Sequence, residues 1–216
     1  MNNYIDSYCE RTMQGFWDEP LNALTNIAFL LAAFFAYRKA QHENALDKGM
    51  WGMIAILCAI GVGSFLFHTL ATGWAMIADT TPILIFQIGF LGFYARRVMG
   101  FGWSGAAILL GLFFAHVLFF AQFPQSWLNG SLGYAPAFQF LLILAVYHWM
   151  AKKRERYGLL MAAGTFAVSL TLRTLDEKLC ASMPFGTHFV WHCLNAAVLY
   201  LCLRVLVVNK KEAVLP

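Results

Sequence analysis

Five polar side chains in this sequence are of types that carry out metal-assisted chemistry, and all five lie in or beside long apolar runs. Ser64 and His68 are four residues apart at the end of the run GVGSFLFHTL, so they share one face if the run is helical. His188 and His192 have the same spacing in THFVWHCLN, and Asp79 lies in ADTTP. An Asp at the centre of a membrane helix costs about 2.5–3.5 kcal/mol on insertion scales, so such residues generally have a partner or a function.

Three neutral imidazoles with an open fourth position form a catalytic zinc site. His188 and His192 could bind one ion from neighbouring turns of a helix, and His68 would complete the set from a second helix. Such an ion lowers the pKa of a bound water to about 7 and polarises a carbonyl. Asp79 could then accept the proton of the water or orient a histidine, and Ser64 could donate a hydrogen bond to a developing oxyanion.

Each of these residues also has a structural interpretation. A His-x-x-x-His pair is by itself a weak motif. Asp79, followed by two threonines and Pro82, is typical of a helix N-cap with proline in the first turn. Ser64 stands beside Gly61 and Gly63 and could serve the close packing of two helices. The occurrence of all the polar groups at a similar depth favours a site over these alternatives.

The elements that must position these residues are predicted to be membrane-spanning helices. The chain is 60% hydrophobic and 12% charged, with a mean hydropathy of +0.62, which excludes both a soluble fold and disorder. Crossing a bilayer core takes roughly 20 helical residues, and the apolar runs are too long and too uniform for the strands of a barrel. We therefore expect a single all-α domain over residues 1–216, a polytopic membrane protein with seven transmembrane helices: Leu21–Tyr37, Met50–Leu70, Asp79–Tyr94, Ser104–Gln122, Tyr134–Met150, Gly158–Leu172 and His188–Val208.

The basic residues predict the orientation of these helices, because they concentrate in alternate connections. By the positive-inside rule the strongly basic connections are cytoplasmic, which places the N-terminus outside and the C-terminus in the cytoplasm. The net charge of +4 is thus no sign of nucleic-acid binding. The acidic start of the chain differs from a signal peptide, so the first span is expected to be retained. The basic set is Arg38, Lys39, Lys48, Arg96, Arg97, Lys152, Lys153, Arg154, Arg156, Lys210 and Lys211, and the outer set is Arg11, Arg173 and Lys178.

The sequence resembles the alkaline ceramidase family, within the superfamily that includes the progestin and adiponectin receptors. The resemblance rests on GSFLFHTL, on Asp79 with a proline three residues later and on HFVWH, with support from YCER and EPLNALTN. It covers almost the whole chain. It implies a seven-helix membrane hydrolase that cleaves the amide bond of ceramides to give a sphingoid base and a fatty acid. Zinc would be held by His68, His188 and His192, with Ser64 and Asp79 as catalytic residues.

The same resemblance implies a calcium site in the amino-terminal segment. Glu10 and Glu19 match two ligands of the family's site. Ser7 and Thr12 stand where the family has Asp and Asn, and Asp6 is one residue out of register. Calcium prefers six to eight oxygens, which Glu10, Glu19, Asp6 and backbone carbonyls could supply. The alternative is a solvated acidic segment.

Two of the five cysteines, Cys9 and Cys180, lie in predicted outer segments. An oxidising outer space allows a disulfide between them, which would tie the amino-terminal segment to the connection before the last span. Cys58, Cys193 and Cys202 lie within spans and are expected to be small apolar side chains.

We expect a zinc-dependent hydrolase of lipid amides, most directly of ceramide, whose partners are the bilayer and its lipids. The hydrocarbon tails would lie between helices, near Phe65, Phe67, Phe86 and Phe90. The alternatives are a hydrolase of another lipid amide or ester, and a non-enzymatic receptor or scaffold with structural zinc. Short cytoplasmic loops disfavour a receptor, and a transporter would need charges through the full membrane depth. Short loops also favour a bacterial inner-membrane protein with its site near the periplasmic side.

Overall fold

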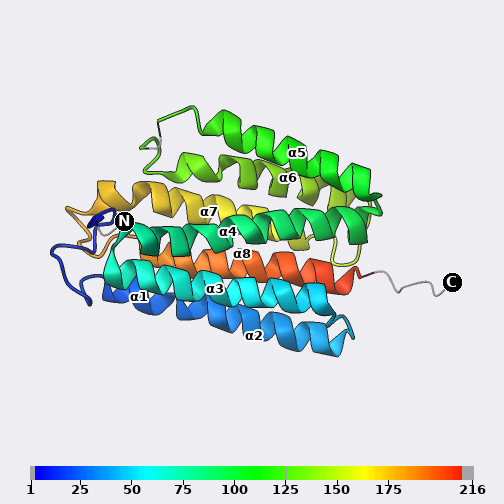
Figure 1. Cartoon of the computed structure of the whole chain (residues 1–216), viewed down its shortest axis with the longest axis horizontal. Helices are drawn as coiled ribbons and strands as arrows, with labels where there is room; N and C mark the ends of the chain where they lie inside the picture. The colour runs from blue at the N-terminus through cyan, green and yellow to red at the C-terminus, as the bar shows by residue number, and fades with distance from the viewer. Residues whose placement is uncertain (1–2, 125, 211–216) are drawn as a thin grey trace.

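In the part of the chain that the structure describes, the protein is an all-α bundle of seven helical spans, each long and apolar enough to cross a membrane (Figure 1). The computed structural model describes residues 3–124 and 126–210. Within these residues the strand-like pairing is a single antiparallel bridge between Tyr4 and Thr72. The elements are α1 (Pro20–Thr25), α2 (Ile27–His42), α3 (Lys48–Leu70), α4 (Gly73–Phe93), a π-helical turn (Tyr94–Met99), α5 (Trp103–Phe120), a 3₁₀ turn (Ser131–Tyr134), α6 (Ala135–Met150), α7 (Gly158–Leu179) and α8 (His188–Val208).

The predicted spans agree with these helices except at a few helix ends. Helix α8 has the predicted bounds, and α1 and α2 together form the first span. Helix α4 begins at Gly73, six residues before the predicted start at Asp79. Helix α7 continues seven residues past the predicted end at Leu172, because Arg173 and Asp176 have partners inside the protein. Hydropathy alone therefore placed these two ends wrongly.

Helix α8 is the centre of the bundle, and α5 lies at its outside. In the most apolar 18-residue window of α8, 56% of the residues are buried, against 11% for α5. Helix α8 packs against α2 and α7, whereas α5 packs against α4 and α6 (Figure 1). His188 and His192 thus belong to the helix that is best shielded from lipid.

A glycine contact brings α3 against α4 at the depth of the candidate site. A Cβ atom on Gly63 would lie 2.1 Å from the carbonyl oxygen of Ala78, so only glycine allows this approach. The next residues along each helix are Ser64 and Asp79. The small-residue packing expected near Ser64 is therefore real, but Gly63 provides it.

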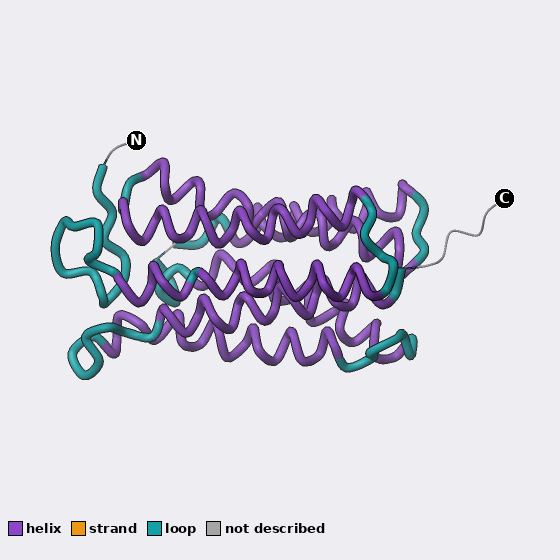
Figure 2. Tube along the Cα trace, turned by 90° about the horizontal axis from the view of Figure 1, so that it is seen from below, coloured by secondary structure: helices purple, strands orange, loops and turns teal. Residues whose placement is uncertain are grey.

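The two ends of the bundle differ in charge and in covering. The strongly basic connections, α2–α3, α6–α7 and the one before α5, all lie at the end away from the amino-terminal segment (Figures 1 and 2). The other end carries the amino-terminal segment and the α7–α8 connection. Lys211, one of the basic residues expected on the cytoplasmic face, lies outside the described residues.

The amino-terminal segment is fixed over its end of the bundle by the predicted disulfide. Cys9 and Cys180 are bonded, with their Cα atoms 5.2 Å apart. The backbone N–H of Cys9 also donates to Asp176 Oδ2 at 3.1 Å. Gly186 has φ +59°, and a Cβ atom there would lie 2.1 Å from Asp176 Oδ1. Glycine at this position therefore lets the α7–α8 connection fold against the disulfide.

Candidate metal centre

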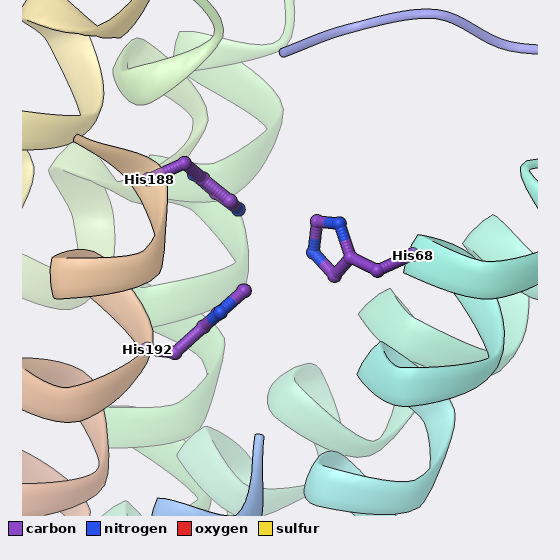
Figure 3. Close-up of side chains that lie close together, drawn as sticks. All are labelled: His68, His188 and His192. Atoms are coloured by element: carbon purple, nitrogen blue, oxygen red, sulfur yellow. The ribbon is translucent and has the colours of Figure 1, made fainter. Parts of the chain in front are cut away.

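His68 on α3 and His188 and His192 on α8 converge on one point inside the bundle (Figure 3). One ring nitrogen of each lies within 4.8 Å of the others, and the side chains are at most 2% exposed. The three rings meet edge to face or tilted, with centroids 4.7–5.2 Å apart. Three buried imidazoles in this arrangement could hold a metal ion.

The surroundings of His68 fix which of its nitrogens faces the centre. Nδ1 lies 2.5 Å from Glu19 Oε2. Burial works against a charge on Glu19, but the hydrogen bonds and charges of His68 and Arg11 outweigh it and hold the pKa of Glu19 below its usual range. An ionised carboxylate can only accept, so His68 Nδ1–H donates to it. His68 Nε2 is buried without a hydrogen-bond partner in the described structure, and its free lone pair is available to a metal.

The same reasoning applies to His192 through Thr25. The hydroxyl of Thr25 donates to the carbonyl of Leu21 at 2.7 Å, as its place on α1 allows. Its oxygen lies 3.0 Å from His192 Nδ1 and can therefore accept a hydrogen bond from that nitrogen. With Nδ1 as the donor to Thr25, Nε2 is the nitrogen of His192 that a metal could bind.

His188 is placed through its backbone and its ring face. Its N–H donates to Asp176 Oδ1 at 2.9 Å, and that oxygen also accepts the N–H of Thr187 at 2.6 Å. Asp176 is fully buried and holds the first turn of α8 to α7. The ring of His188 stacks on Tyr8, with centroids 3.6 Å apart and planes at 19°.

Arg11 supplies the positive charge that balances Glu19. Its Nε–H donates to Glu19 Oε1, and its Nη2 donates to the carbonyl oxygen of His68 at 2.7 Å. Arg11 is only 5% exposed and Glu19 only 2%. A buried ion pair is tolerated when the remaining hydrogen bonds are made, and here Asn22 Nδ2 donates to the second oxygen of Glu19 at 2.9 Å.

The acidic residues expected to bind calcium are exposed or have partners within the protein. Glu10 accepts the backbone N–H groups of Leu21 and Asn22 at 2.7 and 2.8 Å, and burial raises its pKa. Asp6 is exposed, and Glu19 is occupied by the contacts above. Among the described residues, the one group of His, Cys, Asp or Glu that could hold a metal is the three-histidine cluster. The calcium site, which would also use backbone carbonyls, stays a prediction.

Ser64 and Asp79 line a small cavity beside the histidines. Asp79 lies inside α4, whose N-cap is Thr72, so the N-cap interpretation of Asp79 is wrong. Its side chain interacts with Ser64 across the α3–α4 contact. The cavity is lined by Tyr8, Phe29, Ile60, Ser64, Asp79, Ile83, Tyr134, His188, Trp191, His192 and Asn195.

A larger apolar cavity adjoins the small one deeper in the bundle. Four residues line both cavities: Ile60, Ile83, Tyr134 and Asn195. Phe86 and Phe90 line the larger cavity, as expected.

The other two phenylalanines proposed as lining lie elsewhere. Phe65 faces a groove on the outside of α1 and α3, and Phe67 packs edge-on against the ring of Tyr8.

Several residues of the site were not identified from the sequence. Tyr8, Thr25, Asp176 and Asn195 contact the histidines or line the cavities beside them. Arg173 lies over the rings of Tyr8, Tyr134 and Trp191 at 5.4–6.0 Å. One signal was present: an Arg and an Asp close to a predicted span end, where ionisable residues tend to have partners.

No known protein family matches the chain, and no curated protein sequence matches it.

Proposed function

We propose that this protein is a zinc-dependent hydrolase of lipid amides within the membrane, with ceramide as the expected substrate. The observation that carries the proposal is the continuity of three features. Two of the three clustered histidines, the carboxylate of Asp79 and the hydroxyl of Ser64 line one small cavity, and four residues of that cavity also line the apolar cavity beside it. A polar reaction centre that opens into an apolar chamber suits a substrate with a reactive polar group on a long hydrocarbon chain.

The donor set fits zinc. His68 offers a buried nitrogen without another partner, because its other ring nitrogen lies against Glu19. Three imidazole nitrogens with a fourth position open to a cavity are the ligands of catalytic zinc, which lowers the pKa of a bound water and polarises a carbonyl. Glu19 and Thr25 hold two of the rings in the required tautomer.

Three residues of the small cavity would each have a separate role in the reaction. Asp79 would accept a proton from the attacking water and return it to the leaving amine, a role worth about 10²–10⁴ in rate. Ser64 would donate a hydrogen bond to the carbonyl oxygen as it gains negative charge, worth about 10²–10³. The ring of Tyr8 covers His188 from the amino-terminal side and separates it from solvent.

The site end of the bundle is proposed to face outward, on the periplasmic side of a bacterial inner membrane. Two observations support this orientation. The disulfide at this end requires an oxidising compartment. The strongly basic connections lie at the opposite end, as the positive-inside rule requires of a cytoplasmic face.

Zinc content and lipid hydrolysis test the function together. We expect about one zinc per chain in the purified protein, measured by elemental analysis. We also expect release of fatty acid from ceramide, measured by mass spectrometry. His188→Ala should lose both, whereas His42→Ala should keep both, because His42 is the exposed last residue of α2 at the far end of the bundle. Hydrolysis of esters but not amides would move the proposal to an esterase. Bound zinc without turnover of any lipid would favour a receptor or scaffold.

A further inference from the structure

The buried amide of Asn195 has no role in the chemistry described above. We infer that Asn195 is the specificity residue of the site and that it binds a hydroxyl group close to the scissile amide of the lipid. This inference rests on the proposed function, because it names a feature of the substrate of the same site.

Asn195 is buried but has no partner in the protein. It is 6% exposed and lines both cavities, and among the described residues its side-chain amide has no hydrogen-bond partner. An amide can donate two hydrogen bonds and accept two. Leaving such a group unpaired in an apolar wall is costly, so the position is expected to serve a ligand.

The position of Asn195 indicates which part of a lipid it would meet. Asn195 is three residues after His192 and seven after His188, which places all three on one face of α8. It lines both the small cavity and the apolar cavity, whereas Ser64 and Asp79 line only the small one. Its amide therefore faces the first atoms of the chain that leads away from the carbonyl into the apolar cavity.

Helix geometry sets how far along that chain the group would lie. Three residues of α-helix rise about 4.5 Å, and an extended chain advances about 1.2 Å per bond. The substrate group that meets the Asn195 amide is therefore about three to four bonds from the scissile carbonyl carbon. A hydroxyl at that distance both donates and accepts, as an amide does. The apolar lining residues Ile60, Ile83 and Val198 offer it no hydrogen bond, and the other side chains of the apolar cavity that could are Gln87 and Tyr134.

The hydroxyl could stand on either side of the amide. In one case the base chain enters the cavity and presents the hydroxyl of a sphingoid base. In the other the acyl chain enters and presents a 3-hydroxyl of the fatty acid. Both have the same chemistry at the same distance, and matched substrates distinguish them.

The experiment compares wild type with Asn195→Leu on two pairs of lipid amides, each pair with and without one hydroxyl. One pair is ceramide and its 3-deoxy counterpart. The other is an N-(3-hydroxyacyl) and an N-acyl long-chain amine. Wild type should prefer the hydroxylated member of one pair by about 10–100-fold in kcat/KM, because the lipid without the hydroxyl leaves the Asn195 amide without a hydrogen-bond partner. Asn195→Leu should abolish that preference by lowering kcat/KM for the hydroxylated lipid. The kcat/KM for the lipid without the hydroxyl should change by no more than about threefold.

Two controls separate recognition from structure and from failure of the proposed function. Asn195→Leu should keep full zinc and an equal or higher melting temperature, because the amide has no protein partner to lose. Zinc-free protein should also be stabilised more by the hydroxylated lipid than by its partner in a thermal-shift assay, and Asn195→Leu should remove this difference.

Three results would overturn the inference. They are no preference of wild type in either pair, an equal fall in the kcat/KM of Asn195→Leu for both members of a pair, and a lower melting temperature of Asn195→Leu than of wild type. Absence of turnover by wild type on all four lipids, with the binding difference intact, would instead overturn the hydrolase and leave the role of Asn195.

Discussion

Glu19 is the buried carboxylate that joins Arg11 to His68, and Glu19→Gln tests how the metal site is supported. The substitution keeps the shape of the side chain and removes its charge. Loss of an orienting carboxylate behind a metal-binding histidine typically weakens metal affinity 10–100-fold, and a neutral amide oxygen is the weaker acceptor. It also leaves Arg11, which is 5% exposed, without its counter-charge, at a cost of about 3–5 kcal/mol in stability.

The double variant R11M/E19Q separates the two effects. With both charges removed, no buried charge is left unpaired, so most of the lost stability should return. Zinc affinity should stay about 10–100-fold low, because His68 still lacks its carboxylate. Recovery of stability without recovery of zinc affinity is the expected pattern.

Chelator competition measures the zinc affinity, and thermal unfolding in detergent measures the stability. Glu177→Gln is the matched control, because Glu177 is an exposed carboxylate at the same end of the bundle. Unchanged zinc affinity in Glu19→Gln would refute the reasoning, since the short contact to His68 would then not support the metal. Recovery of both quantities in the double variant would show that Glu19 acts on the metal only through folding.

Three further predictions concern the ends of the bundle. Dialysis against a calcium chelator should leave the melting temperature and zinc content unchanged, because the acidic side chains of the amino-terminal segment are exposed or already hydrogen-bonded; a rise on adding calcium would contradict this. Gly186→Ala should destabilise by about 1–3 kcal/mol, because its Cβ would collide with Asp176 Oδ1; an unchanged melting temperature would show that the connection can shift. Asp47 is half-buried, which raises its pKa, but Met50 N–H and Arg97 outweigh this and hold the pKa below its usual value. Its stabilisation should therefore be complete above about pH 4 and lost as the pH falls through the lowered pKa. Asp47→Ala should cost about 0.5–2 kcal/mol at pH 7, with the two melting curves converging in acid; a constant difference at all pH values would rule out the carboxylate.

The sequence by itself determined the features that depend on neighbours along the chain. Apolar runs of the right length predicted seven spans and their order, because the bilayer sets the length of a helix that must cross it. The i, i+4 spacing of His188 and His192 placed both on one helix face. Alternation of the basic connections placed Cys9 and Cys180 at the same end, where the structure joins them.

Only the tertiary structure decided what depends on contacts between distant residues. Thr25 and His192 are 167 residues apart, and Glu19 and His68 are 49 apart, so no local pattern pairs them. Asp79 carries the sequence signature of an N-cap, yet α4 begins six residues earlier and directs Asp79 to Ser64. Glu19 matched a calcium ligand by its position, but the buried guanidinium of Arg11 supplies the charge that its carboxylate requires. In a membrane-embedded core each buried charge needs a partner, and the fold, not the order of residues, determines which partner is within reach.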